Sequence, residues 1–137
     1  MPRIVLAIPC FNEAERLPRD SVRQIVRDSD LDLILVDDGS TDGTRDILDG
    51  LRSEAADRIA VLALPGNRGK AEAVRQGLLS ALDRADIVGY ADADFATPAE
   101  ELLRIAAVIQ ETGVDAVLGS RVAILGAHID RSPVRHY

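Results

Sequence analysis

Two aspartates separated by one small residue are the part of this sequence with the most chemical content. Asp92 and Asp94 follow a short apolar run, Ile87 to Tyr90, which is typical of a buried strand. Their oxygens suit a hard cation, Mg²⁺ or Mn²⁺, which keeps coordination positions open for substrate phosphate oxygens. An isolated Asp-x-Asp is common by chance, and such residues also cap helices or face water. The aspartate pair therefore indicates a metal site only together with the other polar clusters of the sequence.

Three further polar clusters also follow apolar runs: Pro9-Cys10-Phe11-Asn12-Glu13, Asp37-Asp38-Gly39-Ser40 and Gly66-Asn67-Arg68-Gly69-Lys70. Asp38 offers an acceptor for the N–H groups or hydroxyls of a nucleotide. Lys70, with its glycines and the start of a helix, suits a phosphate. Each cluster also has a plainer interpretation. The second is a turn in which Ser40 or Thr41 caps the next helix, and the third is a solvated loop.

The elements that would position these clusters alternate between strands and helices. Five apolar runs predict strands: Ile4 to Ile8, Leu31 to Val36, Ile59 to Leu64, Ile87 to Tyr90 and Ala116 to Leu118. This alternation predicts a mostly parallel sheet in a three-layer α/β/α, Rossmann-like fold. Ligands of such sheets bind beyond the carboxyl ends of the strands, so the four clusters should line one crevice.

Apolar residues at helical spacing fill the gaps between the strands. The predicted inward-facing stripes are Val22, Ile25 and Val26; Thr44, Ile47, Leu48 and Leu51; Ala71, Val74, Leu78, Ala81 and Leu82; and Leu102, Ile105, Ala106 and Ile109. The last helix has a predicted capping box, with Thr97 at the N-cap, Pro98 at the first position and Glu100 behind it.

Composition limits the classes of function. The 137 residues fit one domain, and the net charge of −7 argues against a general nucleic-acid binder. With the single cysteine, Cys10, no intrachain disulfide forms, which fits a cytoplasmic protein. No stretch is apolar enough to span a bilayer, so membrane contact is expected to be peripheral. The tail, residues 121–137, has three arginines and one aspartate. Its formal net charge is therefore positive, whereas that of the rest of the chain is negative.

Together these clusters resemble glycosyltransferase family 2, whose catalytic domains have the GT-A fold. The matching stretches occur in the family's order: Ile8 to Glu13, Val36 to Thr44, Asn67 to Lys70, Ala91 to Asp94 and Gly119-Ser120-Arg121. Within the family the chain looks most like the polyprenyl-phosphate branch, especially dolichyl-phosphate glucosyltransferases. Lys70 to Gly77, the Ala91 to Asp94 run and Arg131-Ser132 carry that closer likeness.

The resemblance implies an inverting hexosyltransferase that uses a UDP- or GDP-sugar and Mg²⁺ or Mn²⁺, in cell-envelope or glycan biosynthesis. It implies that the nucleotide-sugar is bound by Pro9, Phe11, Glu13, Asp38, Lys70 and Asp92. Asp92 and Asp94 would serve the ribose, the metal and the diphosphate. Arg121 and Arg131 would meet the phosphate of the acceptor or the sugar.

The acceptor can be narrowed by chemistry. A hydroxyl acceptor needs a general base, and Asp130 is the sole carboxylate after Arg121. An ionised lipid phosphate needs only cations to position it, and the basic tail offers them. A polyprenyl phosphate is therefore the preferred acceptor. A hydroxyl acceptor stays open as an alternative.

The resemblance also implies a division of the chain. Residues 1–120 would form the nucleotide-sugar-binding half of a GT-A domain, and residues 121–137 the start of the acceptor-binding region. Family members usually continue further, so we expect a truncated or split gene product. A fragment that binds the donor without transfer is therefore a second alternative. The incomplete sheet would leave an edge that favours a homodimer at the cytoplasmic membrane face.

Overall fold

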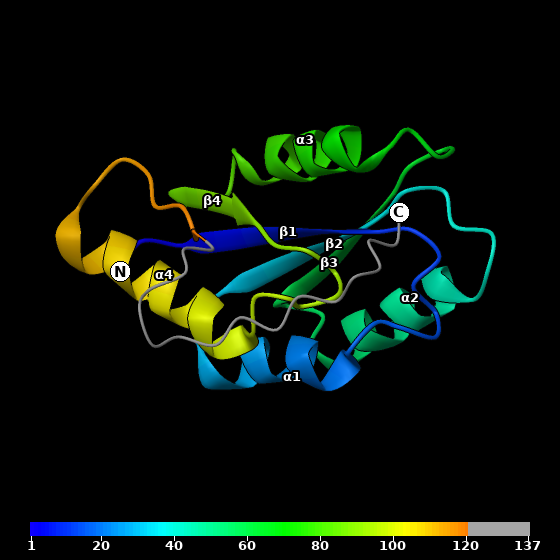
Figure 1. Ribbon diagram of the computed structural model, residues 1–137, viewed down its shortest axis with the longest axis horizontal. Coiled ribbons are helices and arrows are strands. Elements are labelled where there is room, and N and C mark those ends of the chain that lie inside the picture. Colours follow the sequence, from blue (N-terminus) through cyan, green and yellow to red (C-terminus); the bar gives the residue numbers. More distant parts are fainter. Residues whose placement is uncertain (121–137) are drawn as a thin grey trace.

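The computed structural model describes residues 1–120 as strands that alternate with helices (Figure 1). In chain order these are β1 (Ile4–Cys10), α1 (Arg19–Asp28), β2 (Asp32–Asp37), α2 (Thr44–Glu54), β3 (Ile59–Ala63), α3 (Lys70–Ala81), β4 (Ile87–Tyr90) and α4 (Ala99–Thr112). The strands form one parallel sheet in the order β3-β2-β1-β4. The predicted α/β fold class is confirmed.

The predicted fifth strand is wrong. Residues 116–118 form no strand, and Leu118 is 89% exposed. A short apolar run becomes a strand only when a neighbour takes up its backbone hydrogen bonds, and β4 pairs with β1 alone in the described sheet. The apolar run at 116–118 meets no such partner within residues 1–120.

Side chains of the central strands alternate between two cores, as the period of a strand requires. Leu6 and Ile8 belong to the larger core, which lies under α1, α2 and α4. Val5 and Ile34 belong to the smaller core, which α3 covers on the opposite face (Figure 1). The predicted three layers are therefore confirmed.

Helix α3 packs through smaller residues than the sequence pattern predicts. Its buried positions are Ala73, Gly77 and Ala81, whereas Leu82 is 55% exposed. A Cβ atom added at Gly77 would lie 2.7 Å from the Cβ of Ala7. Of the predicted stripe, Ala81 is buried and Val74 and Leu78 are half-buried, but Ala71 and Leu82 are exposed. A helix this close to the sheet selects the smallest side chains, and hydrophobic periodicity gives no weight to glycine.

Two predicted helix starts are also wrong. α4 begins at Ala99 without a side-chain cap, so Thr97 does not form the predicted capping box. α2 begins at Thr44, and neither Ser40 nor Thr41 caps it as predicted. Instead Asp42 accepts a hydrogen bond from the Thr44 backbone at 2.9 Å. No helix within residues 1–120 is long and apolar enough to cross a membrane.

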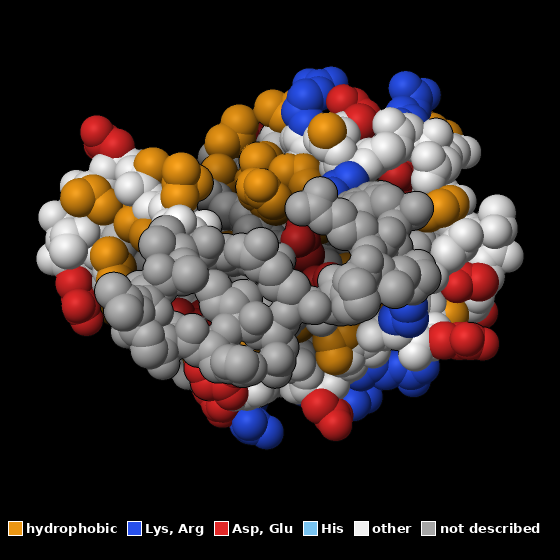
Figure 2. All heavy atoms as spheres, viewed as in Figure 1, with side chains coloured by type: hydrophobic (Ala, Val, Ile, Leu, Met, Phe, Trp, Pro, Cys, Tyr) orange, Lys and Arg blue, Asp and Glu red, His pale blue; other side chains and the backbone are white. Residues whose placement is uncertain are grey.

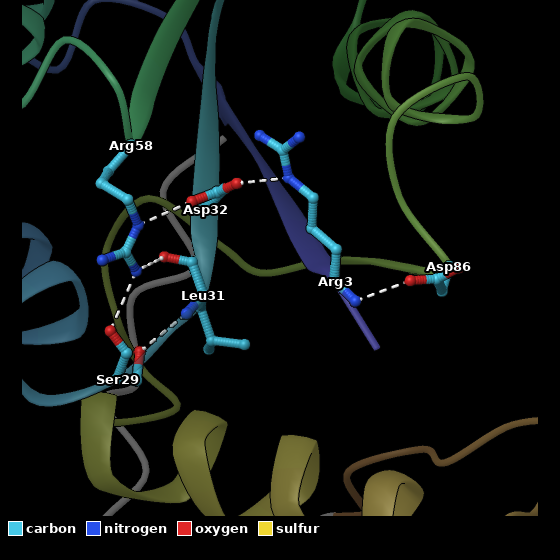
Figure 3. A network of polar contacts seen from close by, with 6 residues as sticks. All are labelled: Arg3, Ser29, Leu31, Asp32, Arg58 and Asp86. Atoms are coloured by element: carbon cyan, nitrogen blue, oxygen red, sulfur yellow. Dashed lines mark hydrogen bonds and ion pairs between the residues drawn. The ribbon is translucent and has the colours of Figure 1, made fainter. Parts of the chain in front are cut away.

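A polar network joins the starts of the strands, at the amino edge of the sheet (Figure 3). The two oxygens of Asp32 accept hydrogen bonds from Nε of Arg3 and Nε of Arg58, each at 2.7 Å. Arg58 also donates from Nη2 to the carbonyls of Ser29 and Leu31, at 2.9 and 2.6 Å. These contacts hold β1, β2 and β3 in register, at the edge opposite the four polar clusters.

Candidate functional site

The strand order creates a switch point between β1 and β4. From β1 the chain steps outward to β2 and β3, then returns across the sheet through α3 to place β4 on the other side of β1. Ligands of open parallel sheets bind beyond the carboxyl ends of the strands at such a point. The loops that leave β1 and β4 there carry Glu13 and the Asp92–Asp94 pair.

Both aspartates of this pair lie outside the hydrophobic core. Ala91, Ala93 and Phe95 are buried in the larger core, while Asp92 is half-buried and Asp94 is exposed. The Phe95 N–H donates to the Asp92 carbonyl at 3.1 Å, which closes a tight turn. Phe95 takes a left-handed backbone conformation, with φ of 50°, that is uncommon for a bulky residue. The buried alanines and Phe95 thus leave both carboxylates toward solvent.

Glu13 lies in the loop after β1, next to the strand that carries the aspartate pair. Burial raises the pKa of Glu13 above its ordinary value, Arg16 opposes that shift, and Asp94 adds to it. Arg16 Nη2 lies 3.2 Å from Glu13 Oε1. The parallel pairing of β1 with β4 places the loops after the two strands at the same edge of the sheet. The role of their side chains in a site stays a prediction.

A lysine from α3 reaches the same place. Lys70 is the first residue of α3, and its Nζ lies 2.5 Å from Oδ1 of Asp92. The two side chains are 32% and 41% exposed, respectively. Gly69 precedes the helix with φ of 94°, a conformation that favours glycine. The loop after β3 thus joins those after β1 and β4.

Asp38 holds that third loop in place. Its carboxylate is 2% exposed and accepts the backbone N–H groups of Arg68 and Gly69, at 2.8 and 3.0 Å. The next residue, Gly39, has φ of 69°, and a Cβ there would lie 2.4 Å from the Asn67 nitrogen. Asp38 is therefore a buried anchor for the start of α3, and the segment is a turn without the predicted helix cap.

The loop after β2 also holds the loop after β1, through residues that sequence reasoning did not assign. Successive N–H groups of residues 12–14 donate to Oγ of Ser40, Oγ1 of Thr44 and Oδ2 of Asp42, at 3.0, 2.8 and 3.3 Å. Asn12 is left-handed there, with φ of 50°. The signal was the run of short polar residues from Asp37 to Thr44, a composition that favours side chain to backbone bonds.

The other predicted residues fall into two groups. Pro9 is half-buried near the end of β1, and Phe11, just after that strand, is 42% exposed. Between them Cys10 is buried, and burial raises the pKa of its thiol, so the interpretation as an inert core residue is supported. Arg121 and Arg131 lie outside the described residues.

Exposed apolar side chains gather over α3 and β4, on the face seen in Figure 2. Leu79, Leu82 and Tyr90 are 47%, 55% and 57% exposed. β4 is also an outer strand of the described sheet. The homodimer and the peripheral membrane contact stay predictions.

A divalent cation fits the donor set at this edge. Within residues 1–120 no group of three or more His, Cys, Asp or Glu side chains converges to form a complete protein cage. Mg²⁺ in nucleotide sites does not need one, because one or two carboxylates suffice when waters and substrate phosphates supply the remaining ligands. Asp92 and Asp94 match that open kind of site.

Comparisons with known proteins agree with this geometry. The family model described as Glycosyl transferase family 2 matches residues 5–136. The undecaprenyl-phosphate 4-deoxy-4-formamido-L-arabinose transferase of Yersinia enterocolitica is 32% identical over 119 residues, which cover 84% of this chain and 36% of that protein. An N-acetylglucosaminyltransferase of Mesorhizobium japonicum is 33% identical over 129 residues, which cover 89% of this chain and 29% of that protein. The chain thus spans about a third of the length of these relatives.

Solved structures show the same fold. TarS of S. aureus in complex with UDP superposes with a TM-score of 0.69 at 22% identity, covering 94% of this chain and 38% of that one. A mannosyltransferase from Pyrobaculum calidifontis, in complex with GDP-Man and Mn²⁺, is 31% identical with a TM-score of 0.53. That match covers 68% of this chain and 28% of the other.

Proposed function

The chain belongs to the glycosyl transferase family 2, and we propose that it binds a nucleotide-diphosphate sugar at the carboxyl edge of its sheet for transfer of the sugar. The observation that carries this proposal is the convergence at the β1–β4 switch point. There Lys70 contacts Asp92, Asp94 lies in the same loop, and Glu13 lies in the loop after the neighbouring strand β1. A cation and several carboxylates so placed suit a metal-bound diphosphate better than a neutral ligand.

In this proposal the base and ribose lie over the loops after β1 and β2. Phe11 offers an exposed ring to the base, beside Pro9. Asp38 is 2% exposed and accepts two backbone hydrogen bonds, so it would support donor binding indirectly, by holding the start of α3. Glu13 faces the ribose from the other side of the crevice.

The diphosphate lies over Lys70 and the Asp92–Asp94 pair. Asp92 and Asp94 would hold Mg²⁺ or Mn²⁺, and the ion would supply positive charge for the diphosphate as it leaves. Lys70 adds a point charge at the start of α3, where the helix dipole also favours an anion. Support for Mn²⁺ comes from the mannosyltransferase solved with GDP-Man and Mn²⁺.

We propose a polyprenyl phosphate as acceptor. Its phosphate oxygen would attack the anomeric carbon from the face opposite the diphosphate, so that a new carbon–oxygen bond forms as the old one breaks and the configuration inverts. The nucleoside diphosphate leaves, and no proton is transferred because the attacking phosphate is already ionised. Arg121 and Arg131 would position it. The relative from Yersinia enterocolitica, whose name includes undecaprenyl phosphate, supports this choice.

Calorimetry on the 137-residue chain tests donor binding, with UDP-glucose, UDP-GlcNAc and GDP-mannose titrated with and without Mn²⁺. We expect one donor to bind and Mn²⁺ to tighten that binding. Asp94→Asn should lower the affinity measured with Mn²⁺ at least about tenfold, since even outer-shell changes at metal sites cost 10- to 100-fold. The affinity without metal should stay the same.

Asp57→Asn is the matched control, because it removes one exposed carboxylate at the opposite edge of the sheet. An equal loss in both variants, or no effect of Asp94→Asn, would contradict the metal role. Transfer of labelled sugar to undecaprenyl phosphate then separates a transferase from a fragment that only binds the donor. Transfer to a hydroxyl acceptor instead would replace the proposed acceptor.

A further inference from the structure

The ion pair between Lys70 and Asp92 joins the start of α3 to the loop after β4. Lys70 starts α3, and Asp92 follows β4. Their charged atoms, Nζ and Oδ1, are 2.5 Å apart. Both side chains are about one-third exposed or more, so small ions and a donor phosphate can reach them. The ammonium therefore lies where a cation bound to that oxygen would lie.

We propose that Lys70 substitutes for the divalent cation at Asp92 while the donor is absent, and turns to the donor's phosphate when the cation takes its place. This inference rests on the proposed function. An oxygen that accepts an ammonium at this distance has no room on the same side for a metal ion, and the two cations repel each other. Entry of the metal must displace the ammonium from Oδ1.

In the proposal the displaced ammonium of Lys70 contacts the donor phosphate at the start of α3. The Arg68 and Gly69 amides are already engaged by Asp38, so they are occupied when a phosphate arrives at the start of α3. The Lys70 side chain is the group at that helix start that can change partner. Because Asp38 anchors the backbone before the helix, only the side chain of Lys70 needs to move.

The exchange predicts that loss of Lys70 changes the metal affinity and the donor affinity in opposite directions. Without Lys70, the metal has no competitor at Asp92 and should bind more tightly. Without Lys70, the donor phosphate loses its cation and should bind more weakly. If Lys70 had only a structural role, its loss would weaken both metal binding and donor binding. If Lys70 acted only through its long-range positive charge, loss of a nearby arginine would have the same effect.

The test measures Mn²⁺ alone, by electron paramagnetic resonance of the free ion, and then UDP at saturating Mn²⁺, by calorimetry. We expect Lys70→Met to tighten Mn²⁺ binding about two- to fivefold, the range of a partly exposed ion pair. It should weaken UDP binding by about tenfold. Lys70→Arg restores a cation and should return both affinities toward the wild-type values.

Arg68→Met is the matched control, because it removes one exposed positive charge from the same loop. Equal tightening of Mn²⁺ in Arg68→Met and Lys70→Met would mean a long-range charge effect and would overturn the exchange. Loss of both affinities in Lys70→Met, or no change in either, would overturn it as well. If the wild-type chain binds neither Mn²⁺ nor UDP, the proposed function fails first; if it binds both, only the exchange is at stake.

Discussion

The close packing of α3 on the sheet can be tested by substituting Gly77, with Gly50 in the interior of α2 as the control position. Alanine at Gly77 in α3 or at Gly50 in α2 adds the same methyl group and favours the helix by the same amount, about 1 kcal/mol. The surroundings differ. A Cβ at Gly77 would lie 2.7 Å from the Cβ of Ala7 and 2.9 Å from Cγ2 of Val36, whereas nothing lies within 4 Å at Gly50.

The magnitude follows from these distances. Carbon atoms in contact prefer a separation of about 3.5–4.0 Å, so α3 must shift outward by roughly 1 Å to accept the methyl group. Ala7 lies on the central strand β1 and has no rotamer that relieves the clash. Overpacking of this kind costs about 1–3 kcal/mol. Net of the helix gain, we expect Gly77→Ala to lower the free energy of unfolding by up to about 2 kcal/mol and Gly50→Ala to raise it by about 1 kcal/mol.

Urea unfolding followed by circular dichroism measures both changes. A shift of α3 would also carry Lys70 away from the proposed position of the diphosphate, so Gly77→Ala should weaken UDP binding in the presence of Mn²⁺ while Gly50→Ala should not. Equal stability of the two variants would refute the close approach of α3 to the sheet. It would also remove the basis for the position of Lys70.

The remaining predictions concern the two edges of the sheet. Asp32→Ala should lower the free energy of unfolding by about 2–3 kcal/mol, because Arg58 and the more exposed Arg3 lose charge-assisted hydrogen bonds, yet Mn²⁺ affinity should not change. Glu13 has a raised pKa, caused first by burial, so the folded state binds its proton more tightly than the unfolded state and stability falls as the pH rises through that raised pKa. Glu13→Gln should therefore be more stable than the wild type at pH 7 and lose that advantage near pH 4. A pH-independent difference would mean that ionisation of Glu13 carries no cost.

The strands were predictable because their signal is local. β1 and β2 are short, bounded apolar runs, and central strands of a parallel sheet are buried on both faces. The order of the polar clusters then placed Asp92, Lys70 and Glu13 at one edge, by a rule that needs only parallel strands. The run at 116–118 looked the same locally and failed, because pairing depends on a neighbour that no local pattern reveals.

The details of the site were beyond such reasoning for a different reason. The left-handed conformations of Asn12 and Phe95 have no hydrophobic or charge signature, yet they set the path of the loops after β1 and β4. Gly77 carries no apolar surface, yet it decides how near α3 comes. Whether Asp38 faces a ligand or the backbone depends on the path of the loop at Arg68 and Gly69, whose N–H groups it accepts. Sequence spacing does not reveal that path.

The loop after β2 has a special position that follows from the strand order. β2 lies between β3 and β1, so its loop is flanked by the loops that follow both neighbours. It holds the Lys70 side through Asp38 and the Glu13 side through Thr44. Neither neighbouring loop can shift without breaking hydrogen bonds to this one. The short polar residues between Asp37 and Thr44 therefore set the spacing between the Lys70 ammonium and the carboxylates. Substitutions in this loop should change donor affinity and metal affinity in the same direction, whereas loss of Lys70 should change them in opposite directions.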